Sequence, residues 1–293
     1  MDRIALETPA KINLTLRVRG RRPDGYHELE SIMVPIDLWD RLQLERLPAG
    51  LELRCPGQPQ LAGPDNLVLR AARAWLERSR QRFGLRLTLH KAIPLAAGLG
   101  GGSSDAAACL RGMQAIGKAK LSPEELDALA TGLGADVPFF LRAGPQLARG
   151  IGQRLQPLAA LPPFWLLLAC APFGLATRDV FQGLKYPLTI PSDGDRHGTP
   201  QQWGFADLAA GLVNDLQPVA ERIHPEIGRV RRELERSGAA GCLMSGSGPS
   251  VYGVFPDERA ARAAVRRLNE RMGWTYLVLR AINQGYSNSS SSC

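Results

Sequence analysis

A glycine-rich loop between a predicted strand and a predicted helix constrains this chain more than any other segment. Residues 94–108 read PLAAGLGGGSSDAAA, with four glycines within five positions. Glycine reaches backbone conformations closed to other residues, so successive N–H groups can turn inward toward an anion. The segment before the loop, 85–89, alternates leucine with polar residues as a strand does, and the segment after it, 106–116, is a good alanine-rich helix. This order predicts an α+β fold with a phosphate site where the helix begins.

The simplest alternative is a flexible loop followed by an ordinary capped helix, which a lone G-x-G would favour. Here two hydroxyls follow the glycines, and Ser103, Ser104 and Asp105 are expected at the capping positions, where free amides bind phosphate well. The loop is not a Walker A loop, because no Gly-Lys-Ser/Thr follows it. A dinucleotide fingerprint is excluded as well, because serine or aspartate stands where its last glycine belongs.

The composition excludes several other classes of protein. Hydrophobic residues make up 44% of the chain and charged residues 22%, as in a folded globular protein. The net charge of +8 suits anionic ligands such as nucleotides, but the basic residues are not interleaved with aromatics, so no nucleic-acid binding is expected. Five widely spaced cysteines without C-x-x-C spacing indicate free thiols in the cytoplasm. The most apolar run, 164–171, is too short to span a membrane, and the N-terminus lacks a signal peptide.

The 293 residues are expected to form two lobes and a tail. Residues 1–158 hold the glycine-rich loop and are expected to form the phosphate-binding lobe, in which a helix is predicted over 66–82 with Asp65 as its N-cap. Residues 159–283 form the second lobe, in which helices and strands alternate after a long loop at 185–204. The Ser-rich stretch 284–293 is expected to be a disordered polar tail.

Four more segments make the pattern specific: 9–14 (PAKINL), 22–29 (RPDGYHEL), 134–140 (GADVPFF) and 245–249 (SGSGP). Together with the glycine-rich loop, in this order and spacing, they resemble the GHMP kinases, which include galactokinase, homoserine kinase and mevalonate kinase. The resemblance runs to about residue 283, and its most specific part is Asp-Gly-Tyr-His at 24–27. It implies a two-lobed GHMP kinase fold of the α+β class, with the active site in the cleft between the lobes.

The resemblance also implies a reaction. The DGYH segment is similar to the branch of the family that uses ATP to phosphorylate the 2-hydroxyl of 4-diphosphocytidyl-2-C-methyl-D-erythritol, in the non-mevalonate isoprenoid pathway. Magnesium is implied by the ATP chemistry. Its ligands stay unknown because no acidic cluster is visible, and Ser104 or solvent with phosphate oxygens are the ligands expected. The oligomeric state also stays open, with a homodimer as one option.

Phosphoryl transfer needs alignment of the reactants and positive charge around the transferring group. By resemblance, Asp136 is the catalytic base that accepts the proton of the substrate hydroxyl, and Lys11 faces it. Without the resemblance, Asp136 would be assigned to a turn or a helix cap, and Lys11 would be a solvated strand lysine. Asn13 follows Lys11 by two residues, so it points to the same face of the strand and is expected to hold the substrate.

The nucleoside of the acceptor has its own predicted residues. By resemblance, Tyr26 and Phe181 sandwich the cytosine and His27 reads its polar edge. The alternative is a packed tyrosine and a surface histidine, with Phe181 buried by an amphipathic helix over 177–184. Gly246 and Gly248 form a second glycine-rich turn that closes over the substrate phosphates, although a tight hairpin loop covers the same residues.

The resemblance places the ATP-binding residues at the loop and at two positions near the adenine, Asn66 and Lys91. The loop residues are Pro94, Gly98, Gly100, Gly101, Gly102, Ser103 and Ser104. Two other functions compete with this interpretation: a GHMP kinase for homoserine or mevalonate, and a nucleotide-binding module without catalysis. Residues 24–27 argue against the first, because those substrates have no base to read, and the presence of both Lys11 and Asp136 argues against the second.

Overall fold

The computed structural model describes residues 2–158, 161–184, 203–268 and 273–283. Helices and strands are mixed along the chain, and the predicted α+β class is confirmed. The predicted tail at 284–293 and residues 185–202 of the predicted long loop lie outside the described residues.

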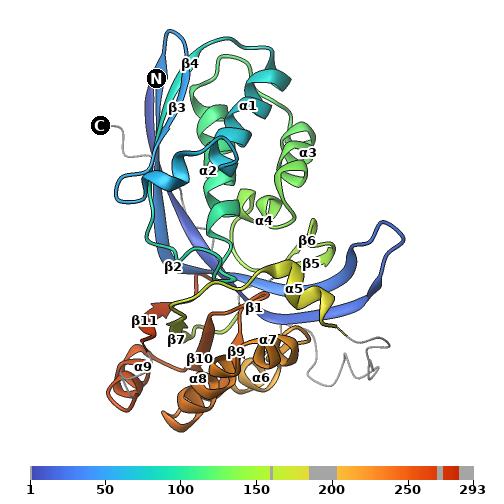
Figure 1. Cartoon of the computed structure of the whole chain (residues 1–293), viewed down its shortest axis with the longest axis vertical. Coiled ribbons are helices and arrows are strands. Elements are labelled where there is room, and N and C mark those ends of the chain that lie inside the picture. Colours follow the sequence, from blue (N-terminus) through green and yellow to red (C-terminus); the bar gives the residue numbers. More distant parts are fainter. Residues whose placement is uncertain (1, 159–160, 185–202, 269–272, 284–293) are drawn as a thin grey trace.

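The spine of the molecule is a long antiparallel hairpin of β1 (Arg3–Arg21) and β2 (His27–Leu47). It crosses the molecule in Figure 1, and its tip projects from one side. The larger sheet has the order β3-β4-β2-β1-β8, and β5 and β6 extend it beside the other half of β2. The strands added to the hairpin are β3 (Leu51–Arg54), β4 (Gly84–His90), β5 (Gln146–Gly150), β6 (Arg154–Pro157) and β8 (Val213–Asn214).

Four helices pack on one face of this sheet, in the upper part of Figure 1. The central helix of the four, α2, is rich in alanine and glycine, so the α2 backbone approaches the sheet closely. A methyl group on Gly112 would lie only 2.7 Å from the Leu44 side chain. Trp75 is fully buried beside it, and its indole N–H donates to Gln114. The four helices are α1 (Leu67–Ser79), α2 (Gly101–Ile116), α3 (Pro123–Leu133) and α4 (Val137–Leu141).

A second, four-stranded antiparallel sheet has the order β11-β7-β10-β9. One of its faces packs on the first sheet through residues such as Ile12, Val34 and Leu168, and the other face is covered by the C-terminal helices. Its strands are β7 (Trp165–Cys170), β9 (Gly241–Met244), β10 (Val251–Phe255) and β11 (Thr275–Arg280). The remaining helices are α5 (Thr177–Gln182), α6 (Phe205–Ala210), α7 (Gln217–Ile223), α8 (Pro225–Arg236) and α9 (Glu258–Val265).

Two predicted helix starts are wrong. Helix α2 begins at Gly101, not at 106, because Gly100 adopts a left-handed conformation and serves as the N-cap. Ser103, Ser104 and Asp105 therefore lie inside the first turns and do not cap the helix. Helix α1 is capped by Asn66, whose side chain accepts a hydrogen bond from the N–H of Val68, and not by Asp65.

The predictions on cysteines and membrane spans concern the same described residues. Cys55, Cys109, Cys170 and Cys242 are free thiols, as predicted. Among the helices that the structure describes, none has both the length and the apolar character needed to cross a membrane.

Candidate active site

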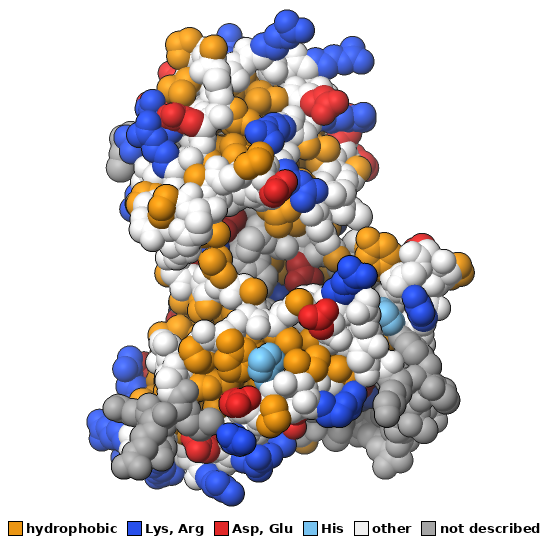
Figure 2. All heavy atoms as spheres, viewed as in Figure 1, with side chains coloured by type: hydrophobic (Ala, Val, Ile, Leu, Met, Phe, Trp, Pro, Cys, Tyr) orange, Lys and Arg blue, Asp and Glu red, His pale blue; other side chains and the backbone are white. Residues whose placement is uncertain are grey.

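A cavity of about 1180 Å³ lies where the two sheets and their helices meet. Its lining comes from β1, from the loop before α2, from the segment before α4, from α5, and from the turn between β9 and β10. Figure 2 shows the surface hollowed between the upper and lower parts of the molecule. Segments distant in sequence thus contribute to one site.

The predicted catalytic pair, Lys11 and Asp136, meets in this cavity. The Lys11 ammonium lies 3.5 Å from a carboxylate oxygen of Asp136, and it donates to the amide oxygen of Asn13 at 2.7 Å. The Lys11 side chain is 5% exposed and that of Asp136 is 34% exposed, so the carboxylate faces the open cavity. The Asn13 amide in turn donates to the Ser31 hydroxyl at 2.7 Å, which fixes its orientation. The geometry therefore presents one cation, one carboxylate and one fixed amide to a ligand.

Local structure explains why these side chains point inward. Lys11 and Asn13 are two residues apart on β1 and share a face of the strand. Asp136 stands at the N-cap position of α4, but its side chain makes no capping hydrogen bond, so the carboxylate is available elsewhere. It is the only carboxylate among the described residues that line the cavity.

The glycine-rich loop forms one wall of the cavity. Gly98 and Gly100 have positive φ angles of 75° and 71°, a region that disfavours other residues. The lining includes Pro94 and Ser103, together with the glycines at 98 and 100–102. Because α2 begins directly after Gly100, the free N–H groups of its first turn lie at the cavity, as phosphate binding requires.

The second glycine-rich turn, 245–248, packs against the first. The Ser245 hydroxyl donates to the carbonyl of Gly98 at 2.9 Å, and a methyl group on Gly98 would lie 2.1 Å from the Ser245 carbonyl. A methyl group on Gly246 would lie 3.2 Å from the Lys11 ammonium, and Gly246 and Gly248 also have positive φ angles. The two predicted loops are therefore one continuous surface around Lys11.

The three aromatic residues predicted for the nucleoside gather at the tip of the β1–β2 hairpin, but in a different arrangement. Phe181 of α5 stacks on His27, with ring centroids 4.9 Å apart, while Tyr26 is 61% exposed. The predicted pairing of Tyr26 with Phe181 is thus not the stack found here. Burial lowers the pKa of His27, and the charge of Arg21 adds to this, so the imidazole is neutral at physiological pH. A neutral imidazole can both donate and accept a hydrogen bond.

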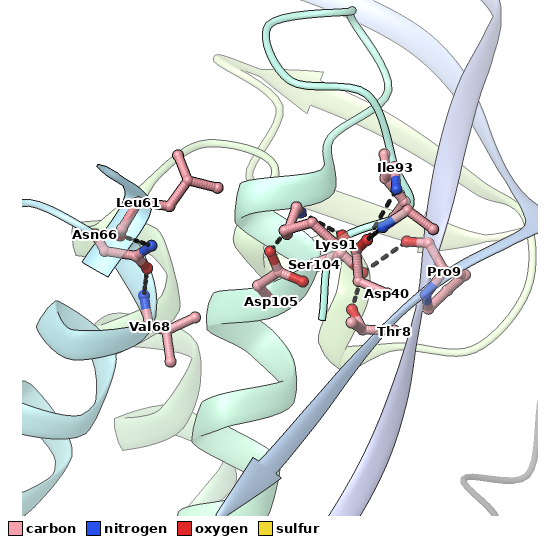
Figure 3. Close-up of polar contacts among 11 residues, drawn as sticks. Thr8, Pro9, Asp40, Leu61, Asn66, Val68, Lys91, Ile93, Ser104 and Asp105 are labelled. Carbon is pink, nitrogen blue, oxygen red and sulfur yellow. Dashed lines mark hydrogen bonds and ion pairs between the residues drawn. The ribbon is translucent and has the colours of Figure 1, made fainter. Parts of the chain in front are cut away.

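Lys91 lines the cavity but is held in a buried ion cluster (Figure 3). Its ammonium contacts the carboxylates of Asp40 and Asp105, the latter at 2.7 Å, and all three side chains are at most 4% exposed. Asp40 also accepts hydrogen bonds from the N–H groups of Ala92 and Ile93. One lysine therefore ties the interior of β2 and the start of the loop to the first turns of α2.

The protonation of this cluster follows from two carboxylates sharing one cation. Burial lowers the pKa of Lys91, but Asp105 and Asp40 outweigh it, so the pKa lies above its ordinary value. Burial raises the pKa of Asp105 to about 7, although Lys91 opposes the shift. One oxygen of Asp105 is buried without a hydrogen-bond partner among the described residues, which agrees with a carboxyl that is partly protonated.

Two of the residues predicted to bind ATP have their side chains engaged elsewhere (Figure 3). Ser104 is fully buried, and its hydroxyl donates to the carbonyl of Pro9 and contacts the Thr8 hydroxyl. Its hydroxyl is therefore engaged within the fold, and Ser104 is not among the described residues that line the cavity. The Asn66 side chain caps α1 and donates to the carbonyl of Leu61, so it is not free for an adenine in this structure.

Asp40 and Tyr252 were not predicted as part of the site. Asp40 organises Lys91, and the Tyr252 hydroxyl donates to the carbonyl of Asn13 at 2.8 Å from the opposite sheet. The one available signal was an aspartate directly after the largely apolar segment 32–39, in the interior of a strand, where a buried carboxylate needs a partner.

Two family models match the chain. The model described as GHMP kinases N terminal domain covers residues 66–144, which include the glycine-rich loop and Asp136. The model described as GHMP kinases C terminal covers 204–273, which include the turn at 245–248. The chain belongs to the GHMP kinases.

Curated relatives within the GHMP kinases share about two fifths of the sequence. A protein of Syntrophus aciditrophicus (strain SB), named 4-diphosphocytidyl-2-C-methyl-D-erythritol kinase, is 41% identical over 276 residues, which are 94% of this chain and 98% of the relative. A protein of Moorella thermoacetica with the same name is 43% identical over 276 residues, or 92% of this chain and 96% of the relative. The similarity therefore spans both parts of the GHMP kinase fold.

Solved GHMP kinase structures agree. A crystal structure of 4-(cytidine 5'-diphospho)-2C-methyl-D-erythritol kinase is 38% identical, with a TM-score of 0.81, and covers 97% of this chain and 100% of its own. A homoserine kinase from Cytophaga hutchinsonii is 18% identical, with a TM-score of 0.76, and covers 97% and 96%. The second likeness shows the fold alone, and the two-lobed fold is confirmed.

Proposed function

We propose that this chain is an ATP-dependent kinase that phosphorylates the 2-hydroxyl of 4-diphosphocytidyl-2-C-methyl-D-erythritol in isoprenoid biosynthesis. The observation that carries the proposal is the single cavity that holds both the Lys11–Asp136 pair and the His27–Phe181 stack. The names of the relatives at about 40% identity support it. A homoserine or mevalonate kinase would have no use for a pair of stacked rings at the far end of its acceptor site.

In the proposed mechanism, Asp136 accepts the proton of the acceptor hydroxyl as that oxygen attacks the γ-phosphorus of ATP. Lys11, whose ammonium lies 3.5 Å from the Asp136 carboxylate, would meet the charge on the transferring group. Asn13, oriented by Ser31, holds the acceptor. The acceptor oxygen forms a new bond to the γ-phosphorus, the bond from that phosphorus to the β,γ-bridging oxygen breaks to release ADP, and the hydroxyl proton moves to Asp136.

The donor side uses the wall between Gly98 and Ser103. The free amides of the first turn of α2 would bind the phosphates of ATP, and the Ser103 hydroxyl would add a donor. Lys91 borders this wall, and its buried carboxylates orient it. We assign Lys91 chiefly to holding the glycine-rich loop in shape. Two carboxylates already contact its ammonium, so at most one N–H is left to contact ATP.

Magnesium would neutralise phosphate charge in this reaction. The described residues offer such an ion few protein ligands. No group of three or more His, Cys, Asp or Glu side chains gathers in the described part of the chain, and Asp136 is the only carboxylate in the described cavity lining. This suits an ion held mainly by phosphate oxygens and water, which is the way magnesium usually binds in such sites.

We further propose that residues 1–158 and 159–283 are the two functional lobes, one for ATP and one completing the acceptor site. The free thiols of the described cysteines support a cytoplasmic location.

One assay tests the proposed function. The purified chain is given ATP with the cytidine-diphosphate alcohol, with mevalonate or with homoserine, and ADP release is recorded. We expect turnover with the first acceptor alone, and the Asp136→Asn variant serves as the control for background ATP hydrolysis. Faster turnover of mevalonate or homoserine would replace the proposed acceptor with one of those alcohols.

A further inference from the structure

Arginines crowd the tip of the β1–β2 hairpin, and most of their guanidinium groups are already paired with carboxylates. The ion pairs there are Arg19 with Glu30, Arg22 with Asp24 and Glu28, Arg149 with Glu30, and Arg154 with Glu28. A guanidinium in such a pair offers a ligand little net charge. These arginines mainly serve the hairpin itself.

Arg21 and Arg178 differ from them. Both line the cavity, and within the described part of the chain neither guanidinium has an ion-pair or hydrogen-bond partner. Both side chains are exposed to solvent. The cavity therefore carries two arginine charges that no acidic group of the described protein neutralises.

The two arginines come from different elements and flank the same aromatic stack. Arg21 pairs in register with His27 across β1 and β2, and it is close enough for its charge to contribute to the lowered pKa of that imidazole, after burial. Arg178 lies three residues before Phe181 on α5, and residues three apart share a helix face. Since Phe181 stacks on His27, both guanidinium groups lie beside the predicted base subsite.

We infer that Arg21 and Arg178 bind the diphosphate of the acceptor nucleotide. The inference rests on the proposed function, since it takes a cytidine diphosphate-linked alcohol as the acceptor. Arg21, Arg178, His27 and Phe181 all line one cavity, so a nucleotide whose base binds beside the two rings would carry its diphosphate into the space that these arginines border. Guanidinium groups match phosphate oxygens with two parallel hydrogen bonds. The ATP phosphates have a separate wall at the glycine-rich loop, so these two arginines serve the acceptor.

The test separates charge recognition from base recognition. Dissociation constants of CDP and of cytidine are measured by isothermal titration calorimetry for the unaltered chain, Arg21→Ala, Arg178→Ala and the double variant. Cytidine has the base and the ribose but no diphosphate. For CDP we expect roughly a three- to tenfold weakening per substitution and a larger loss in the double variant. Cytidine should change by less than about twofold.

Two matched variants sharpen the result. Arg82→Ala removes an exposed arginine outside the cavity lining, changes the net charge equally and should leave CDP binding unaltered. Arg178→Lys keeps the positive charge but not the planar guanidinium with its two parallel N–H donors. Its affinity for CDP should therefore lie between those of Arg178→Ala and the unaltered chain. In steady-state kinetics, the KM for the acceptor should rise in the alanine variants, and the KM for ATP should not.

An equal loss of CDP and cytidine binding would overturn the inference, because the arginines would then act on the base or on local structure. Unchanged CDP binding in the double variant would overturn it as well. Failure of the proposed function has a different signature: the unaltered chain would bind ATP but neither CDP nor cytidine, and both proposals would then fall.

Discussion

Lys11 and Lys91 are both buried lysines at the wall of the same cavity, yet their surroundings differ. The Lys11 side chain is 5% exposed, and it faces one carboxylate at 3.5 Å and the neutral amide of Asn13. Lys91 is 4% exposed and is shared by two carboxylates, Asp40 and Asp105, that are themselves buried. The position of a lysine beside a cavity therefore does not define its role. The number and burial of the carboxylates around the ammonium define it.

The difference lies in what each ammonium has left to offer. Lys11 has a single acidic partner that is 34% exposed, so part of its charge is available to an incoming phosphoryl group. Lys91 is shared by two buried carboxylates, and these ion pairs join β2 and the start of the loop to α2. The predictions below test this contrast, beginning with the largest effect.

Replacing Asp136 by asparagine should reduce turnover by roughly a thousandfold or more, because the amide cannot accept the hydroxyl proton. The affinity for ATP should stay within about twofold, because Asp136 lies outside the glycine-rich loop. Turnover is measured by coupled ADP release and ATP binding by calorimetry. Asp65→Asn, an exposed change outside the cavity lining, is the control. Turnover within a few fold of the original would remove Asp136 from the role of base.

Lys91→Met should destabilise the fold far more than Lys11→Met. Loss of Lys91 leaves two buried carboxylates without a cation, which costs about 3–5 kcal/mol of the free energy of unfolding. Loss of Lys11 leaves only the partly exposed Asp136 and should cost about 1 kcal/mol or less. Urea unfolding of both variants gives the comparison, and equal costs would contradict the contrast between the two lysines.

Asp105→Asn should change how stability depends on pH. The pKa of Asp105 is raised to about 7 in the folded chain by burial, so its contribution to stability is fully present below the unfolded pKa and is lost as pH rises through the folded value. Asparagine has no such loss. From about pH 4 to about pH 7, the difference in melting temperature between variant and unaltered chain should therefore shift in favour of asparagine. A constant difference would show that Asp105 stays ionised throughout.

Ser104→Ala should have the smallest effect. It removes the hydrogen bond from the hydroxyl to the Pro9 carbonyl, which costs about 1 kcal/mol of stability, and it should leave the KM for ATP unchanged. Ser103→Ala is the matched change on the cavity side and should raise the KM for ATP. The reverse result would place Ser104 at the phosphates and Ser103 in the fold.

The sequence was sufficient for features that depend on local periodicity. Lys11 and Asn13 share a strand face because the side-chain period of a strand is two, and the glycine spacing marked the loop before α2. The direction of Ser104 was missed because it depends on where the helix begins, which the left-handed Gly100 moves to residue 101. Because α2 starts five residues earlier than predicted, Ser104 lies within the helix and its side chain is buried, whereas it was predicted to cap the helix.

Contacts between segments that are distant in sequence could not be predicted from the sequence. The partner of Lys91 on β2 is 51 residues away in sequence, and nothing in the local pattern marks Asp40 as buried and paired. The stack of His27 on Phe181 likewise depends on how α5 lies along the hairpin, and the sequence predicted Tyr26 as the ring facing Phe181. Such contacts are set by tertiary packing, which periodicity does not encode.

The hydrogen bond between Ser245 and Gly98 has a mechanical consequence. The turn at 245–248 and the glycine-rich loop are in direct backbone contact, because a methyl group on Gly98 would lie 2.1 Å from the carbonyl oxygen of Ser245. A displacement of that turn is therefore expected to move the glycine-rich loop as well. If ATP and the acceptor nucleotide bind at these two turns as proposed, binding of one is expected to change the affinity for the other.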